Sequence, residues 1–140
     1  MAEKSHCYDW PRPAVTTDIV VLREAQVLLI RRAHPPFAGS WALPGGFLDE
    51  DETLEVCAAR ELLEETGVAA DTLRLVGTYS EPKRDPRHRT VTVAFLTRAP
   101  AGTEAKAGDD AAEAAWFALD ALPPLAFDHA DILQDALKMA

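Results

Sequence analysis

A short acidic segment of this 140-residue chain has the residue types and spacing of a metal-binding helix. Between positions 46 and 68 it reads GFLDEDETLEVCAARELLEETGV, with eight acids and one base, Arg60. At 100° per residue, Glu61, Glu64 and Glu65 fall on one side of a helix, where like charges repel one another. A solvated face would more often alternate Glu with Lys. The clustered carboxylates therefore favour bound Mg²⁺ or Mn²⁺, which prefer oxygen ligands.

The helix that must carry these carboxylates is predicted over residues 53–65. Asp51 and Thr53 are both candidate N-caps, and Gly67 is placed to end the helix. An apolar stripe with spacing i, i+3, i+7 should pack against the core, with the three glutamates facing the other way. The members of this stripe are Val56, Ala59 and Leu63, flanked by Leu62.

Most of the remaining elements are predicted to be β-strands. The expected strands cover residues 16–23, 27–30, 41–43, 72–79, 90–97 and a segment from 115, and a second helix covers 128–139 with Asp128 as its N-cap. The first two strands should form a hairpin. Their apolar runs are continuous rather than alternating, which is typical of strands buried on both faces. A sheet covered on each side is therefore expected.

Length and composition indicate one globular domain over residues 16–140, preceded by an irregular lead-in over 1–15. The net charge is −9, of which the acidic segment contributes −7, so the basic surface that nucleic-acid binding needs is not expected. No apolar run approaches the roughly 20 residues of a membrane helix, and the N-terminus lacks the apolar region of a secretory signal. Two distant cysteines are typical of a reduced, cytoplasmic protein.

The acidic segment matches every specified position of the Nudix box, G-x5-E-x7-R-E-U-x-E-E-x-G-U, where U is apolar. The matching residues are Gly46, Glu52, Arg60, Glu61, Leu62, Glu64, Glu65, Gly67 and Val68. The chain thus resembles the Nudix hydrolases, the MutT-like family. The resemblance implies an α/β fold, an α/β/α sandwich with a central mixed β-sheet. It also implies hydrolysis of a nucleoside diphosphate linked to another moiety.

The resemblance also implies roles for individual residues. Glu61, Glu64 and Glu65 would ligate the metal, together with the backbone carbonyl of Gly45 or Gly46. Glu52 would act through water or pair with Arg60, which would orient the glutamates. Bound metal would neutralise the diphosphate, lower the pKa of a water molecule and hold that water in line with phosphorus.

The general base is expected outside the box, as is common in this family. Asp109, Asp110 and Glu113 lie in a loop just before Trp116 and are the candidates. Each of them is equally compatible with an ordinary hydrophilic loop.

The substrate is predicted from a basic loop over residues 83–89, where Arg84 and Arg87 could bind a phosphate. A solvated turn is the alternative. With residues 41–46 and 125–129, this loop resembles the ADP-ribose pyrophosphatase branch and the Nudix domain of regulators that sense NAD-related metabolites. ADP-ribose, cleaved to AMP and ribose 5-phosphate, is the favoured substrate. A MutT-like hydrolase of nucleoside triphosphates and a non-catalytic sensor are the rivals.

Other residues have weaker indications. Trp41 and Phe37 could stack on adenine or pack in the core, and Arg31 or Arg32 could reach a phosphate. His129 is interpreted as part of a helix start rather than as a catalytic group. Cys57 should pack in the core. Tyr8 and Trp10 could pack across a homodimer, which is common in the family.

Overall fold

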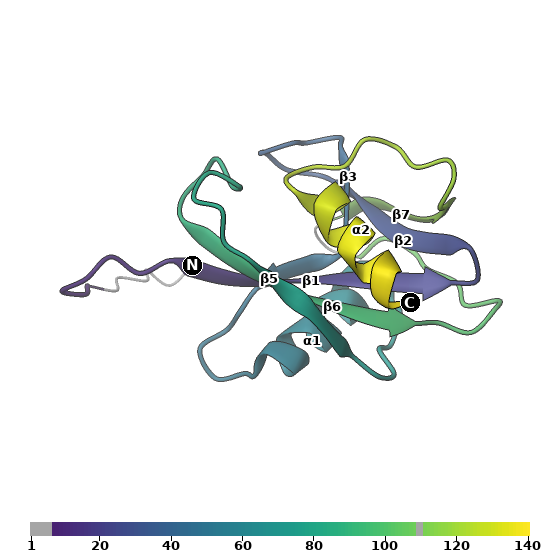
Figure 1. Cartoon of the computed structure of the whole chain (residues 1–140), viewed down its shortest axis with the longest axis horizontal. Coiled ribbons are helices and arrows are strands. Elements are labelled where there is room, and N and C mark those ends of the chain that lie inside the picture. The colour runs from purple at the N-terminus through teal and green to yellow at the C-terminus, as the bar shows by residue number, and fades with distance from the viewer. Residues whose placement is uncertain (1–6, 109–110) are drawn as a thin grey trace.

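The fold is described by a computed structural model that covers residues 7–108 and 111–140. Figure 1 shows its elements in chain order. They are β1 (Ala14–Arg23), β2 (Gln26–Arg32), β3 (Trp41–Ala42), β4 (Gly45–Phe47), α1 (Leu54–Thr66), β5 (Arg74–Tyr79), β6 (Thr90–Arg98), β7 (Ala111–Ala118) and α2 (His129–Met139).

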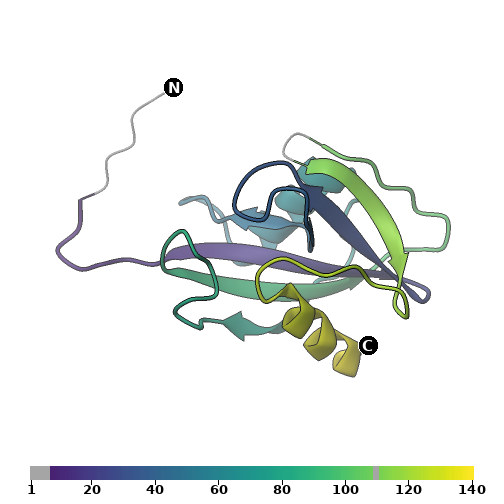
Figure 2. The same cartoon turned by 90° about the horizontal axis from the view of Figure 1, so that it is seen from above.

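The strands form one mixed sheet. Its main order is β3-β2-β1-β6-β5, with β4 also paired to β1 and β7 to β2. The pair β1–β6 is parallel, whereas the other pairs are antiparallel. The helices α1 and α2 lie on opposite sides of the sheet (Figure 2). The predicted sandwich with a central mixed sheet is therefore confirmed.

Residues 19–22 of β1 are all apolar because their successive side chains enter two different cores. Val20 and Leu22 pack in the cluster that includes α2, and Ile19 and Val21 pack in the cluster that includes α1. All four are at most 2% exposed. The prediction from the continuous apolar run, a strand buried on both faces of the sheet, is thus confirmed.

Strands β1 and β2 separate soon after their hairpin turn. They pair only at Leu22 with Val27 and at Arg23 with Gln26. Towards its beginning β1 pairs instead with β4, where Asp18 lies opposite Gly45. The start of β1 and the end of β2 are therefore not paired with each other, and a cleft lined by side chains of both strands forms there.

Helix α1 has the predicted limits to within one residue. Of the two candidate N-caps, Thr53 is the one used, since its side chain accepts a hydrogen bond from the Val56 N–H at 3.2 Å. Gly67 ends the helix in the left-handed conformation, with φ of 72°, and donates to the Leu63 carbonyl.

The predicted apolar stripe of α1 is wrong. Val56 and Leu63 are each 54% exposed and Ala59 is half-buried. The buried side of the helix consists instead of Cys57, Ala58, Leu62 and Thr66. Three of these four side chains are small, so the helix can approach the sheet closely enough for its glutamates to reach β4.

Smaller differences from the prediction occur elsewhere. β1 begins two residues earlier than expected, β4 was not expected, and β7 begins at Ala111 rather than at 115. Asp128 occupies the N-cap position of α2 but makes no capping hydrogen bond, because its carboxylate binds Arg84. Within the described residues, no helix is long and apolar enough to cross a membrane.

The neighbouring leucines of α1 test the orientation of the helix. Leu62→Ala removes a fully buried side chain and should lower the free energy of unfolding by about 2–5 kcal/mol. Leu63→Ala, the matched control, should change it by about 0.5 kcal/mol or less. Urea denaturation measures both, and equal losses would contradict this orientation.

Candidate active site

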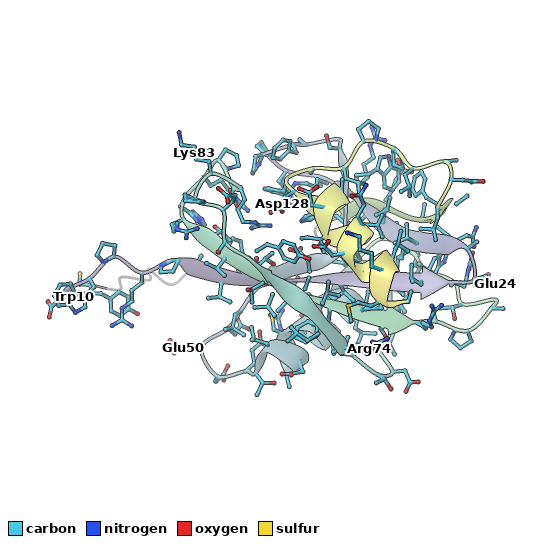
Figure 3. All side chains as sticks on the ribbon, viewed as in Figure 1. Trp10, Glu24, Glu50, Arg74, Lys83 and Asp128 are labelled. Atoms are coloured by element: carbon cyan, nitrogen blue, oxygen red, sulfur yellow. The ribbon has the colours of Figure 1, made fainter. Side chains whose placement is uncertain are left out.

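A cleft with a volume of about 390 Å³ opens where β1 and β2 separate. Figure 3 shows the loop of Lys83 rising beside the start of α2 at Asp128, and the cleft extends from these segments to α1. The residues that line it with polar or aromatic side chains, or through glycine backbone, include Thr16, Asp18, Arg32, Gly45, Gly46, Phe47, Asp49, Arg60, Glu61, Glu65, Arg84, Asp85, Arg87, Phe127 and His129. This volume is within the range of small-molecule sites.

Arg60 is the centre of the acidic end of the cleft. Its Nε and Nη2 donate to the two carboxylate oxygens of Glu52 at 3.0 and 2.7 Å. Its Nη1 donates to both Glu61 and Glu64, at 2.8 and 3.0 Å. One guanidinium therefore fixes three of the box glutamates, and the pairing with Glu52 is bidentate, the stronger arrangement.

The segment of β4 lies against the same glutamates. The Gly45 N–H donates to Glu65 Oε1 at 2.7 Å. A Cβ at Gly46 would collide with the Glu61 carboxylate, and a Cβ at Gly45 would collide with the Thr17 carbonyl. Only glycine allows the backbone to come this close to the carboxylates, which explains the two glycines at this point.

The residues at this end fit a hard divalent cation. They supply carboxylate oxygens from Glu61, Glu64 and Glu65, and the backbone approaches them closely at Gly46. Among the residues that the structure describes, no three acidic, histidine or cysteine side chains are already gathered to hold a metal ion. Oε1 of Glu61 and of Glu64 accepts from Arg60, and Oε1 of Glu65 accepts from the Gly45 N–H.

The pairing of Arg60 and Glu52 changes the acidity of both groups. The hydrogen bonds from Arg60, and then one from the Asp49 N–H, lower the pKa of the Glu52 carboxyl to about 2. The same bonds raise the pKa of the Arg60 guanidinium above its ordinary value. Both groups therefore stay charged throughout the physiological pH range.

A buried pair of Asp18 and His129 lines the other wall of the cleft, and neither residue was predicted as part of the site. His129 Nδ1 accepts from the Leu43 N–H at 3.0 Å, which places a neutral ring's proton on Nε2, 3.4 Å from Asp18 Oδ1. Asp18 Oδ2 accepts from the Thr92 hydroxyl at 2.6 Å. The interpretation of His129 as only a helix start missed these contacts.

Burial alone would raise the pKa of the Asp18 carboxyl, but His129 and the Thr92 hydroxyl outweigh it, and the pKa is lowered overall. A signal for Asp18 was present in the sequence, because it is the only acid within a strand that is otherwise mostly apolar. A buried carboxylate in a strand is uncommon unless it is paired or functional. His129 offered no comparable signal, since its partners come from distant parts of the chain.

The basic loop lies at the cleft, but two of its arginines, Arg84 and Arg87, already have acidic partners. Arg84, whose side chain is 3% exposed, forms a bidentate pair with Asp128 at 2.9 and 2.7 Å. Arg87 pairs with Asp85 at 3.1 and 2.7 Å. Arg84 therefore acts mainly as a link between the loop and α2. Arg32, from the end of β2, is a further cationic side chain in the cleft.

The other predicted site residues lie away from the lining of this cleft. Arg31 points to the other side of β2 from Arg32 and pairs with Glu113 at 2.7 Å. Trp41 packs edge-on against Phe117, with ring centroids 4.7 Å apart. Phe37 packs on the ring of Phe127. Asp109 and Asp110, two of the candidates for the general base, lie outside the described residues.

Cys57 of α1 is buried beneath β4, as expected of a packing residue. Its Sγ lies 3.3 Å from the Thr17 hydroxyl. Burial, followed by the effect of Glu52, raises the pKa of this thiol to about 11, despite the opposing bond from Thr17. Cys7, in contrast, is exposed.

Comparison with known proteins gives a consistent set of relatives. The model of the NUDIX domain family matches residues 12–136. An ADP-ribose pyrophosphatase of Methanocaldococcus jannaschii is 45% identical over 126 residues, which are 90% of this chain and 74% of that protein. The chain spans 54% and 40% of the length of two further relatives.

Two solved structures are also similar. The NUDIX domain of Shewanella oneidensis NrtR, complexed with ADP ribose, has a TM-score of 0.88 and 31% identity, covering 94% of this chain and 93% of that one. A bifunctional NMN adenylyltransferase/ADP ribose pyrophosphatase from Francisella tularensis, complexed with AMP and a manganese ion, has a TM-score of 0.83 and 28% identity. The match covers 94% of this chain and 43% of that one.

Because of the Glu52–Arg60 pair, we expect the difference in the free energy of unfolding between wild type and Glu52→Gln to depend on pH. The folded-state pKa of Glu52, about 2, lies below the ordinary 4.5, so the pair stabilises the fold above pH 4.5 and the contribution is lost as the pH falls towards 2. The gap between wild type and Glu52→Gln in urea denaturation should therefore be constant above about pH 5 and shrink below it. Glu55→Gln, an exposed change on the same helix, should show no such trend.

The two cysteines should differ in reactivity at pH 8. Cys7 should react rapidly with a disulfide reagent, whereas Cys57, which is buried and has a raised pKa, should react only on unfolding. Absorbance of the released thiol measures both steps. A Cys7→Ser variant that still reacted at the rate of a free thiol would contradict this.

Proposed function

The chain belongs to the NUDIX family, and from this premise we propose that it hydrolyses the diphosphate of ADP-ribose to AMP and ribose 5-phosphate. The observation that carries the proposal is a single cleft with box glutamates at one end and arginine side chains at the other. Such a cleft can hold a diphosphate between a cation and guanidinium groups. The names of the Methanocaldococcus relative and of the Shewanella complex support ADP-ribose as the substrate.

The cation is proposed to be Mg²⁺ or Mn²⁺, held by Glu61, Glu64 and Glu65 with a backbone carbonyl of Gly45 or Gly46. Such an ion, when bound, supplies charge neutralisation at the diphosphate and acidifies a water molecule. The chain's own part is to position these oxygens. Arg60 does so through Nη1, and its bidentate bond to Glu52 keeps the guanidinium in place.

Glu64 is proposed as the group that accepts the proton of the attacking water. Its side chain is 52% exposed, compared with 16% for Glu61, so it can reach water while still touching Arg60. Glu113 is a weaker candidate than the sequence indicated, because it is paired with Arg31 away from the cleft lining. The general base is thus proposed to come from the box itself.

A non-catalytic sensor is the second candidate, favoured by the 38% identity to the ADPR responsive transcriptional repressor NtrR of Acinetobacter baylyi. The intact set of box glutamates around Arg60 supports the enzyme instead. Association of two copies is a further proposal, based on Trp10, which is 75% exposed on the segment that runs away from the body in Figure 1.

A substrate panel with Mg²⁺ and Mn²⁺ tests the proposal. Release of AMP from ADP-ribose, followed by chromatography, should exceed turnover of deoxynucleoside triphosphates at equal concentration. Glu64→Gln should lower kcat by about 10²–10⁴-fold because it removes the proton acceptor, with the melting temperature unchanged. Glu55→Gln removes the same charge from an exposed position of α1 and should leave kcat unchanged.

Two outcomes would contradict this assignment. Faster hydrolysis of the triphosphates would move the chain to the MutT-like activity. Tight binding of ADP-ribose without turnover, in wild type and Glu64→Gln alike, would make it a sensor.

A further inference from the structure

Two of the three glutamates proposed to bind the cation lie in the last turn of α1. Glu64 and Glu65 directly precede Thr66, at which the helix ends. The last turn of a helix tends to fray, because its carbonyl groups have no partner further along the helix. Negative side chains are also unfavourable there, since the helix dipole places partial negative charge at this end, and no basic residue of α1 lies in the turn. The order of this turn must therefore come from groups outside the helix.

The segment over residues 103–108, which we call the strap, runs from β6 towards β7 and supplies such groups. The Lys106 N–H donates to the Thr66 carbonyl at 3.0 Å, and the Gly108 N–H donates to the Glu65 carbonyl at 2.8 Å. These carbonyls are among those that a helix leaves without a partner at its C-terminus. The strap therefore caps the end of α1 from a distant part of the chain.

Gly108 lies directly against the backbone of both glutamates. A Cβ at this position would be 1.7 Å from the Glu64 carbonyl oxygen and 3.3 Å from the Glu65 Cα. Because both are backbone atoms, no side-chain rotation could make room for it. The φ of Gly108 is not in the left-handed region, so the lack of space alone requires glycine here. Any larger residue would force the strap and the helix end apart.

The strap is also attached at its beginning and in its middle. The Thr103 carbonyl accepts from Arg23 Nη1. Arg23 is itself fixed, because its Nε and Nη2 donate to Gln26 Oε1 at 3.1 and 2.6 Å, and its guanidinium carbon lies 4.2 Å from the centre of the Trp116 ring. Ala105 packs against the core cluster that includes α1. The sheet thus determines the position of the strap, and the strap in turn holds the helix end.

The backbone of this turn determines where two carboxylates lie. Glu65 Oε1 accepts from the Gly45 N–H at 2.7 Å, and Glu64 Oε1 accepts from Arg60 Nη1 at 3.0 Å. A turn that unwound or shifted would carry both side chains away from these partners. Mg²⁺ demands a near-ideal arrangement of its oxygen ligands, so such a shift would weaken its binding.

We propose that the strap positions Glu64 and Glu65 for the cation, and that it does so through Gly108. Gly108 is a positioning residue, because it acts on the backbone of the helix and does not line the cleft. The assignment of the two glutamates to a cation rests on the proposed function, whereas the capping of α1 rests on the contacts of the strap. A glycine outside the box is thus needed for the box to hold its cation.

The first experiment measures hydrogen exchange of backbone amides in the wild-type protein by NMR. After correction for intrinsic rates, the amides of Lys106 and Gly108 should exchange about tenfold more slowly than that of Ala107, the factor expected for one hydrogen bond. Ala107 is the internal control, because it lies between them, is exposed and has no backbone acceptor among the described residues. Equally fast exchange of all three amides would overturn the inference.

The second experiment compares Gly108→Ala with Gly77→Ala. A Cβ at Gly77, in β5, would lie 3.9 Å from the Tyr79 ring, an ordinary contact, so this variant adds the same methyl group without a collision. Gly108→Ala should weaken Mn²⁺ binding, measured by EPR, by about 10–100-fold, the usual effect of losing a group that orients metal ligands. At saturating Mn²⁺ it should lower kcat for ADP-ribose with little change in KM, since the strap does not line the cleft. Gly77→Ala should behave as the wild type does.

The outcomes separate this inference from the proposed function. If Gly108→Ala, shown to be folded by a thermal melt, binds Mn²⁺ and turns over as Gly77→Ala does, the positioning role is wrong. If Gly108→Ala alone loses Mn²⁺ affinity in a protein that leaves ADP-ribose intact, the positioning role is supported and the proposed function is overturned. The exchange measurement needs no variant, so it tests the strap even if Gly108→Ala does not fold.

Discussion

The interaction on which the site depends is the contact of one guanidinium, that of Arg60, with several carboxylates. Glu52, Glu61 and Glu64 would repel one another on and beside one helix, and Arg60 offsets this repulsion while fixing their directions. The division of its nitrogens matters. Nε and Nη2 hold Glu52, whereas Nη1 alone holds two of the three glutamates proposed to bind the cation, Glu61 and Glu64. The contacts of Nη1 with Glu61 and Glu64 can therefore change without detaching Arg60 from Glu52.

The backbone of residues 43–45, opposite these glutamates, is hydrogen-bonded by three different elements. β1 pairs with it at Gly45, α1 binds the Gly45 N–H through Glu65, and α2 binds the Leu43 N–H through His129. Both helices and the sheet thus meet at a few residues of backbone. This arrangement explains why β1 and β2 separate where they do: β4 takes the place beside β1, and the cleft opens next to it.

Much of this structure could be predicted from local sequence. The limits of α1, the strands buried on both faces and the membership of the family are confirmed. The predicted orientation of α1 was wrong, because the helical wheel gave an apolar stripe through Val56 and Leu63, which are exposed in the structure. The observed orientation, which buries Cys57, Ala58, Leu62 and Thr66, also places Glu61 close against Gly46, a tertiary contact that the helical wheel does not contain. Asp18 and His129 were missed for the same reason, since they are paired across the sheet and α2.

The distribution of charge differs between the two ends of the cleft. The chain carries a net −9, and most of it lies in the segment that forms the acidic end of the cleft. A negatively charged substrate approaching this end would meet repulsion from the carboxylates unless a cation offset it. The other end differs, because Arg32 and Arg87 lie together on Phe127. A phosphate of the proposed substrate would thus be attracted to the arginine end rather than to the acidic end.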